Sequence, residues 1–183
     1  IVEDPYNLNL WVATENSGYY IVNSKFELLD HFTFDPLSPL SISTSNLNDN
    51  DNKTIFFSEK RVIIATNNGL NVFDKKFKNF KRFFKGKKSL FTTNKIIGIE
   101  KIDDKLLIAS EIELVLYDLK TTKFLSKVST PNFINNLRTF SNNVIVLSTN
   151  TTDYKILVDE QEVVLETLKP NFIPSQNNIS ISN

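Results

Sequence analysis

The sequence contains no cysteine, which excludes both a disulfide framework and a thiolate metal site. Its one histidine, His31, lacks the second ligand or partner that metal binding or acid–base chemistry needs. Positive charge is not in excess, because lysine plus arginine and aspartate plus glutamate both number 21. This balance argues against nucleic acid as the main partner. No apolar run approaches the ~18 residues of a membrane span, so we predict no cofactor, metal site or membrane segment in this chain.

Known catalytic motifs are missing as well. There is no glycine-rich phosphate loop, serine nucleophile elbow or HExxH motif. The run Asn48–Asn52 is superficially similar to a calcium-binding loop, but it lacks the glycine and the distal glutamate of an EF-hand. We expect this run to be a solvated loop and His31 to lie at a surface or strand edge. Without a catalytic constellation, we predict that the protein is not an enzyme.

The composition is that of a folded domain, with 40% hydrophobic and 23% charged residues over a length of 183. Short apolar runs such as Val62–Ala65 and Val144–Leu147 have the length of β-strands. No long amphipathic helix is evident. The segment Phe77–Phe84 has some helical spacing, but its surroundings favour a bulged strand. The chain opens at Ile1 without methionine or a signal peptide, which predicts a piece of a longer protein.

One pattern recurs four times along the chain. A short apolar strand ends in a hydroxyl residue, a polar turn follows, a second strand ends at Asn or Asp, and a further apolar strand closes the unit. The hydroxyl residues are Thr14, Thr66, Ser110 and Thr149, which lie 52, 44 and 39 residues apart. A period of about 40–45 residues with four strands per unit is typical of β-propeller blades.

We therefore predict an all-β fold: a β-propeller fragment of about four blades, each a four-stranded antiparallel sheet. The blades are expected at approximately 1–35, 54–85, 95–128 and 133–169, and 170–183 is expected to be a linker into a following blade. The longer first interval contains a polar insertion, Ser43–Lys53, which we expect to be an exposed loop. Gly18, Gly69 and the Asn-rich turns should supply the positive φ that tight hairpins need.

Two segments carry a family resemblance. The strand pair that opens with Leu10–Gly18, followed by the linker Phe32–Ser43, resembles the two-component regulator propeller repeat, which has a Trp-containing strand, a turn glycine and an Asp-Pro-x-x-Pro linker. A second copy of the strand pair is similar at Ile63–Asp74. The similarity is good over roughly residues 1–84 and decays afterwards, where the Trp and the Gly-Leu pair are absent.

The resemblance implies a periplasmic sensor region of a hybrid histidine kinase that responds to glycans. Similar propellers occur in cell-surface and protein-secretion components. On this basis we expect a periplasmic or cell-surface location, a membrane-anchored parent protein, an oligosaccharide ligand, and a protein partner or homodimer. The alternative is a structural or assembly propeller of a cell-envelope complex. No kinase, receiver or DNA-binding domain is present in this chain.

Ligands of propellers usually bind where loops converge at one mouth of the central channel. The turns after the four hydroxyl-ended strands should all emerge on one face. The expected ligand-binding positions in these turns are Glu15, Asn16, Asn67, Asn68 and Glu111, although a role as plain turn residues is the alternative for each.

Two further features have competing interpretations. Trp11 could stack on a sugar ring, but inter-blade packing is the role that its place in the repeat favours. A basic cluster, Lys75–Lys88, is interleaved with phenylalanines and could bind an anionic partner. We favour solvated strand faces for its lysines, with the phenylalanines turned inward.

Overall fold

The computed structural model describes residues 1–47, 54–86, 90–140, 144–159 and 162–168. Within these ranges the chain forms β-strands and no helix, and so nothing that could cross a membrane as a helix. The chain divides into two compact units, Ile1–Ile99 and Glu100–Asn183. The Asn48–Asn52 run and the expected linker at 170–183 lie outside the described residues.

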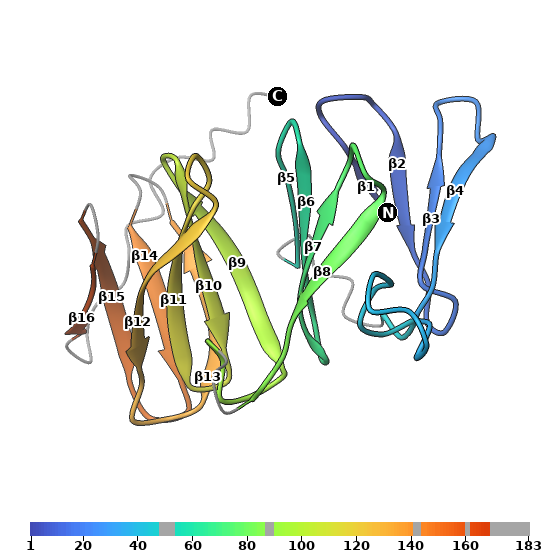
Figure 1. Cartoon of the computed structure of the whole chain (residues 1–183). Helices are drawn as coiled ribbons and strands as arrows, with labels where there is room; N and C mark the ends of the chain where they lie inside the picture. Colours follow the sequence, from blue (N-terminus) through green and yellow to red (C-terminus); the bar gives the residue numbers. More distant parts are fainter. Residues whose placement is uncertain (48–53, 87–89, 141–143, 160–161, 169–183) are drawn as a thin grey trace, which may run out of the picture. The chain divides into compact units, whose positions relative to one another are not determined.

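The strands form four sheets of four (Figure 1). The first two sheets are β1 (Val2–Glu3), β2 (Leu10–Ala13), β3 (Tyr19–Val22), β4 (Leu28–Phe32), and β5 (Ile55–Phe57), β6 (Arg61–Thr66), β7 (Gly69–Asp74), β8 (Asn79–Phe83). The other two are β9 (Ile96–Ile102), β10 (Lys105–Ser110), β11 (Glu113–Asp118), β12 (Lys123–Ser129), and β13 (Ile134–Thr139), β14 (Ile145–Thr149), β15 (Asp153–Val158), β16 (Val163–Thr167). Each sheet is an antiparallel meander in chain order, which confirms the predicted all-β class and sheet type.

The repeated hydroxyl has the same structural task in every sheet. Each one lies where the second strand meets its hairpin turn and donates a hydrogen bond to a backbone carbonyl at the start of the third strand or just before it. The bonds are Thr14 Oγ1 to Gly18 O (2.8 Å), Thr66 Oγ1 to Gly69 O (2.8 Å), Ser110 Oγ to Glu113 O (3.4 Å) and Thr149 Oγ1 to Thr152 O (2.7 Å). The hydroxyl closes the hairpin and satisfies a turn carbonyl.

The Asn or Asp at the end of the third strand caps the next turn in the same repeated way. Its side-chain oxygen accepts a hydrogen bond from a backbone N–H two or three residues on. The bonds run to Asn23 from Lys25 N (2.9 Å), to Asp74 from Lys76 N (2.9 Å), to Asp118 from Thr121 N (2.6 Å) and to Asp159 from Glu162 N (2.8 Å). The sequence repeat therefore encodes two turn hydrogen bonds in every sheet, one made by the hydroxyl and one by the Asn or Asp side chain.

The linker after the first sheet is partly buried, so the prediction that Ser43–Lys53 is an exposed loop is wrong for its first residues. Ser43 is 1% exposed and Leu47 is 7% exposed; residues 48–53 lie outside the described ranges. The backbone N–H of Ser43 donates to Asn71 Oδ1 (2.8 Å), and Asn71 Nδ2 donates to Ser43 Oγ (2.9 Å). Asn71 is itself fully buried, so these bonds satisfy polar groups that water cannot reach.

The turns and the strand after β7 differ in part from what the sequence predicts. Gly18 (φ 75°) and Gly69 (φ 99°) have the expected positive φ, but the same prediction for the Asn-rich turns is wrong, because Asn16, Asn67 and Asn68 do not have a positive φ. The segment from Asn79 to Phe83 is a strand, but its register against β7 is regular, so the predicted bulge is wrong. Register shifts occur instead in other sheets, for example between Ile21 and Val22 of β3.

Candidate functional site

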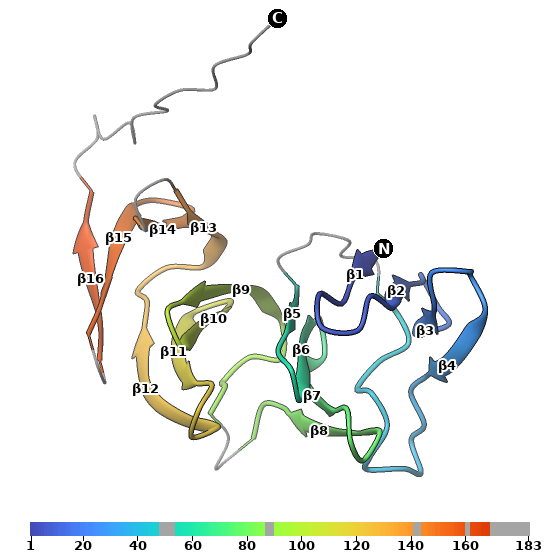
Figure 2. The ribbon, with the colours of Figure 1, turned by 90° about the horizontal axis from the view of Figure 1, so that it is seen from above.

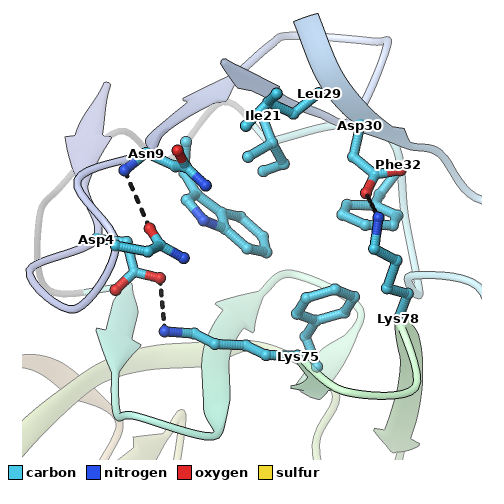
Figure 3. Close-up of a pocket in the computed structure, with 11 residues that line it drawn as sticks. Asp4, Asn9, Ile21, Leu29, Asp30, Phe32, Lys75 and Lys78 are labelled. Atoms are coloured by element: carbon cyan, nitrogen blue, oxygen red, sulfur yellow. Dashed lines mark hydrogen bonds and ion pairs between the residues drawn. The ribbon is translucent and has the colours of Figure 1, made fainter. Parts of the chain in front are cut away.

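A pocket of about 150 Å³ lies within the first unit (Figure 3). It is formed by the β1–β2 loop, the first sheet and the turn that follows β7. Its lining residues are Asp4, Asn7, Asn9, Trp11, Ile21, Leu29, Asp30, Phe32, Phe73, Lys75 and Lys78. An apolar cavity of this volume holds a single six-membered ring such as benzene, so the pocket has room for one ring of a ligand.

The base of the pocket is aromatic and tightly packed. Trp11 is 3% exposed, and its ring centroid lies 6.1 Å from that of Phe32 and 5.4 Å from that of Phe73. Phe32 and Phe73 are in turn 4.8 Å apart. Because each ring is held by the others, the base is preorganised. The expected packing role of Trp11 is confirmed, and the same residue lines the pocket.

One side of the pocket carries a buried ion pair. Asp4 is completely buried, and its Oδ2 lies 2.5 Å from Lys75 Nζ. The other carboxylate oxygen of Asp4 accepts a hydrogen bond from Tyr6 N (3.0 Å), and its backbone carbonyl accepts one from Leu8 N (2.8 Å). The loop therefore wraps around this carboxylate. Among the described residues, neither Asp4 Oδ2 nor Lys75 Nζ makes a hydrogen bond beyond the ion pair, and both atoms are buried. The ammonium of Lys75 lies against the rings of Tyr6 (5.1 Å to the centroid) and Phe57 (5.9 Å).

The opposite side carries a second, more exposed pair. Lys78 Nζ lies 2.6 Å from Asp30 Oδ2, and their side chains are 64% and 31% exposed. Asn7 and Asn9 add amide groups to the lining, and Asn7 Oδ1 accepts a hydrogen bond from Asn9 N (3.0 Å). Figure 3 shows Asp4 and Lys75 facing Asp30 and Lys78 across the pocket.

This arrangement is suited to binding. Each carboxylate is paired with a lysine, so the lining is close to neutral while it offers hydrogen-bond donors and acceptors around an aromatic base. Within the described ranges, no group of three His, Cys, Asp or Glu side chains could hold a metal ion. The chemistry fits a small polar ring better than a charged or purely apolar ligand.

The predicted ligand positions lie elsewhere. Glu15 and Asn16 are exposed in the β2–β3 turn, Asn67 and Asn68 occupy the β6–β7 turn, and Glu111 is half-buried in the β10–β11 turn. In an antiparallel meander these turns leave the opposite end of a sheet from the β1–β2 and β7–β8 connections. The first four residues thus lie at the other end of the first unit's sheets from the β1–β2 loop and the β7–β8 turn, which form the pocket. Figure 1 shows these two connections at one end of the labelled strands. Ligand binding by these five residues stays a prediction.

Asn68 has a structural task in this turn. Its Nδ2 donates to the carbonyl of Ser43 (2.8 Å), and its Oδ1 accepts from Asn94 Nδ2 (3.3 Å). The side chain thereby ties its hairpin to two linker segments. Asn67 borders a hollow of only about 10 Å³, next to Tyr19, whose burial raises the pKa of its phenol above the ordinary value. A volume of this size is at the limit for one water molecule.

The residues that form the pocket were not predicted as a site. Lys75 was grouped with the solvated basic cluster, and this is wrong, because its side chain is 16% exposed and pairs with Asp4. Within the cluster, Phe73 and Phe80 do turn inward, whereas Phe77 is 66% exposed. The sequence feature that could have indicated this site is the loop formed by residues 4–9 between two strand segments. A single sequence does not show that this loop lies next to Lys75.

Comparison with solved structures identifies the fold. The chain is similar to the extracellular domain of the proposed hybrid two-component system BT3049 from B. thetaiotaomicron, with 18% identity over 88% of this chain and a TM-score of 0.64. It is also similar to the dihydro-heme d1 dehydrogenase NirN (14%, 92% of this chain, TM-score 0.57) and to the Neurospora crassa Pan2 WD40 domain (13%, 89%, 0.56). The chain spans 22%, 36% and 47% of those three chains.

No protein family matches the sequence, and no curated protein does. The structural likenesses, all below 25% identity, therefore establish the fold alone. They include an extracellular domain of a two-component system, a dehydrogenase and a WD40 domain, so the fold by itself does not select a function. Together with the four antiparallel sheets, they confirm that this chain has the architecture of β-propeller blades.

Proposed function

We propose that the chain is part of an extracytoplasmic sensor propeller of a two-component signalling protein, which recognises a glycan or relays its binding, and that it is not an enzyme. The observation that carries the proposal is the pocket: room for one ring, an aromatic base, and donors and acceptors around it. The fold of the BT3049 extracellular domain supports the sensor role by analogy. A periplasmic or cell-surface location is part of this proposal.

Recognition would be non-covalent. A pyranose ring would pack its apolar face on the aromatic base of Trp11, Phe32 and Phe73. Its hydroxyls would meet the amide of Asn9 and the exposed ammonium of Lys78. Because the pocket is built by both sheets of the unit, a bound ring would favour one relative placement of those sheets, and binding would shift a population between conformations.

Isothermal titration calorimetry with neutral mono- and oligosaccharides tests the proposal. The informative pair of variants is Asn9→Ala in the pocket and Asn16→Ala in the β2–β3 turn, at the other end of the sheet. Loss of one ligand hydrogen bond should weaken binding by three- to tenfold in Asn9→Ala, on the order of 1 kcal/mol, and leave Asn16→Ala unchanged. The reverse result would move the site to the predicted turns. If no saccharide binds, glycan recognition is wrong.

A second candidate function is an assembly propeller that holds other envelope proteins. It is favoured by the large apolar side chains exposed on the β3–β4 turn, strand β4 and the linker after it: Phe26 is 77% exposed, Leu28 60% and Leu37 92%. This function predicts a defined protein complex that is weakened by Phe26→Ser and Leu37→Ser. It also predicts no saccharide affinity in the calorimeter.

A further inference from the structure

Positive charge is concentrated in one segment of this neutral chain. The 21 residues from Lys75 to Lys95 contain nine lysines and arginines and no acidic residue. The other 162 residues contain twelve basic and twenty-one acidic residues. The chain is therefore a neutral molecule with one strongly basic segment.

The described part of this segment places its charges on an outer strand, β8, and on the residues just before and after it. β8 is the last strand of the second sheet and pairs only with β7 within that sheet (Figure 2). The residues Lys76, Lys78, Lys81, Arg82 and Lys85, here termed the basic strip, follow the β7–β8 turn and β8. All of them are exposed except Arg82, which is half-buried.

Most of these charges have no acidic partner. Among the described residues, only Lys78 of the strip pairs with a carboxylate, that of Asp30. Lys76 Nζ lies 5.2 Å from the ring centre of Phe77, and Lys81 Nζ lies 5.1 Å from that of Phe83. These contacts hold the ammonium groups against aromatic rings at the surface, where they repel one another and are available to an anion.

Protection of a sheet edge does not account for the strip. Edge strands often carry lysine because it discourages pairing with another chain. Among the other outer strands, β4 and β16 contain no lysine or arginine, and β12 contains two lysines, of which Lys127 pairs with the buried Glu113 (3.0 Å). β8 itself also contains two basic residues, and what distinguishes it is the further lysines on either side of it: Lys76, Lys78 and Lys85. Of these three, only Lys78 has a carboxylate partner among the described residues, and this local excess of positive charge suits an anionic ligand.

We propose that the basic strip binds an acidic polysaccharide, whose sugar rings carry carboxylate or sulfate groups. The inference rests on the proposed function in that the ligand is a glycan, and it adds the charge of that glycan and a second binding surface. Phe77, 66% exposed between Lys76 and Lys78, offers a ring face to a sugar.

The strip is continuous with the pocket. Lys78 lines the pocket and also belongs to the strip. A linear glycan could thus pass beside the mouth of the pocket at the β7–β8 turn and continue along β8, with its anionic groups against Lys81 and Lys85.

The experiment measures the affinity of the full chain for polygalacturonate and for heparin, with dextran as the neutral polymer, at about 50 and 200 mM salt. The test variant is Lys76→Glu/Lys81→Glu/Lys85→Glu. The matched control, Lys25→Glu/Lys101→Glu/Lys123→Glu, changes the net charge equally at exposed lysines elsewhere. We expect the test variant to lose at least tenfold in affinity and most of its salt dependence, and the control to lose less than twofold. The triple Lys→Gln variant of the strip replaces the Glu variant if that one does not fold.

Three results would overturn the inference. The first is an equal loss in the test and control variants, which would show a net-charge effect. The second is equally tight, strip-dependent binding of single-stranded DNA or polyglutamate, which would indicate a different class of partner. The third is no binding of either acidic polysaccharide. If the third result occurs while a neutral saccharide binds in an Asn9-dependent way, the strip fails and the proposed function stands.

Discussion

The two units of the chain build the same kind of sheet around different interiors. In the first unit the interior is aromatic: Trp11, Phe32, Phe73 and Phe80 form a connected set of ring contacts with centroids 4.8 to 6.1 Å apart. In the second it is largely aliphatic, and the strand cores Leu106–Ala109 and Leu114–Leu116 are fully buried.

Their hairpins differ too. Three residues after the hydroxyl, the second sheet has Gly69 with a positive φ, and the third sheet has Glu113, whose φ is not positive. Five residues after it, the second sheet has the buried Asn71 and the third has the buried Val115. Both units nevertheless keep the hydroxyl and the Asn or Asp cap. The hydrogen bonds that close the turns are therefore the constant requirement of these sheets, while the interior side chains and their polar network vary.

The largest expected effect is at the turn glycines of the first unit. In Gly18→Ala, the new Cβ would lie 2.0 Å from the carbonyl oxygen of Phe32, at a φ of 75°. We expect a loss of more than ~2 kcal/mol in the free energy of unfolding, measured by urea titration. Glu113→Ala, at the corresponding place in the third sheet, should cost less than ~1 kcal/mol, because Lys127 is one-third exposed and can be solvated. Equal losses would contradict the comparison.

The second effect is at the buried amide. Asn71→Val copies the residue that the third sheet has at this position. It leaves the N–H of Ser43 buried without its acceptor, so we expect a loss of ~1–3 kcal/mol in urea titration. Val115→Ala is the matched change in the other unit, where only packing is lost. If Asn71→Val is neutral, the network does not hold the linker.

The third effect should be present in both units. Thr66→Val and Thr149→Val each remove a hydroxyl that donates to a turn carbonyl and accepts from a turn N–H, that of Asn68 (3.1 Å) or Thr152 (3.0 Å), while keeping the shape of the side chain. Thr66→Val also removes the contact with Ser43 Oγ (3.1 Å). We expect losses of at least ~1 kcal/mol in both, by the same measurement. Thr44→Val, in the linker, serves as the control for a hydroxyl outside the repeat. A loss confined to one unit would show that the repeat has different roles in the two.

The smallest effect concerns pH. The hydrogen bond from the backbone N–H of Thr121 lowers the pKa of Asp118, and the ion pair with Lys120 lowers that of Asp104. A carboxyl whose pKa is lower in the folded state stabilises the fold above its ordinary pKa of about 3.8–3.9. That stabilisation is lost as the pH falls through the lowered value. Asp118→Asn keeps an acceptor that does not titrate, as Asn23 does in the first unit, so its free energy of unfolding should fall less than that of wild type between about pH 4 and 2. Identical acid curves by circular dichroism would contradict this.

Turn chemistry could be predicted from the sequence because its causes are local. The hydroxyls, the Asn or Asp caps and the positive φ of Gly18 and Gly69 each depend on neighbours within about four residues. The burial of Ser43 could not be predicted, because it depends on Asn71, 28 residues away. The pocket is harder still: Asp4 and Lys75 meet only after two sheets have packed, and each alone is an ordinary surface-type residue in the sequence.

The most direct test of the central claim uses Trp11, the chain's single tryptophan, which lines the pocket. Neutral oligosaccharides are titrated while its fluorescence is recorded. If the pocket is the binding site, the fluorescence changes saturably with the midpoint found by calorimetry, and Asn9→Ala shifts that midpoint three- to tenfold while Asn16→Ala does not. Calorimetric binding without any change at Trp11, lost in Asn16→Ala, would contradict the account and place recognition at the hairpin turns.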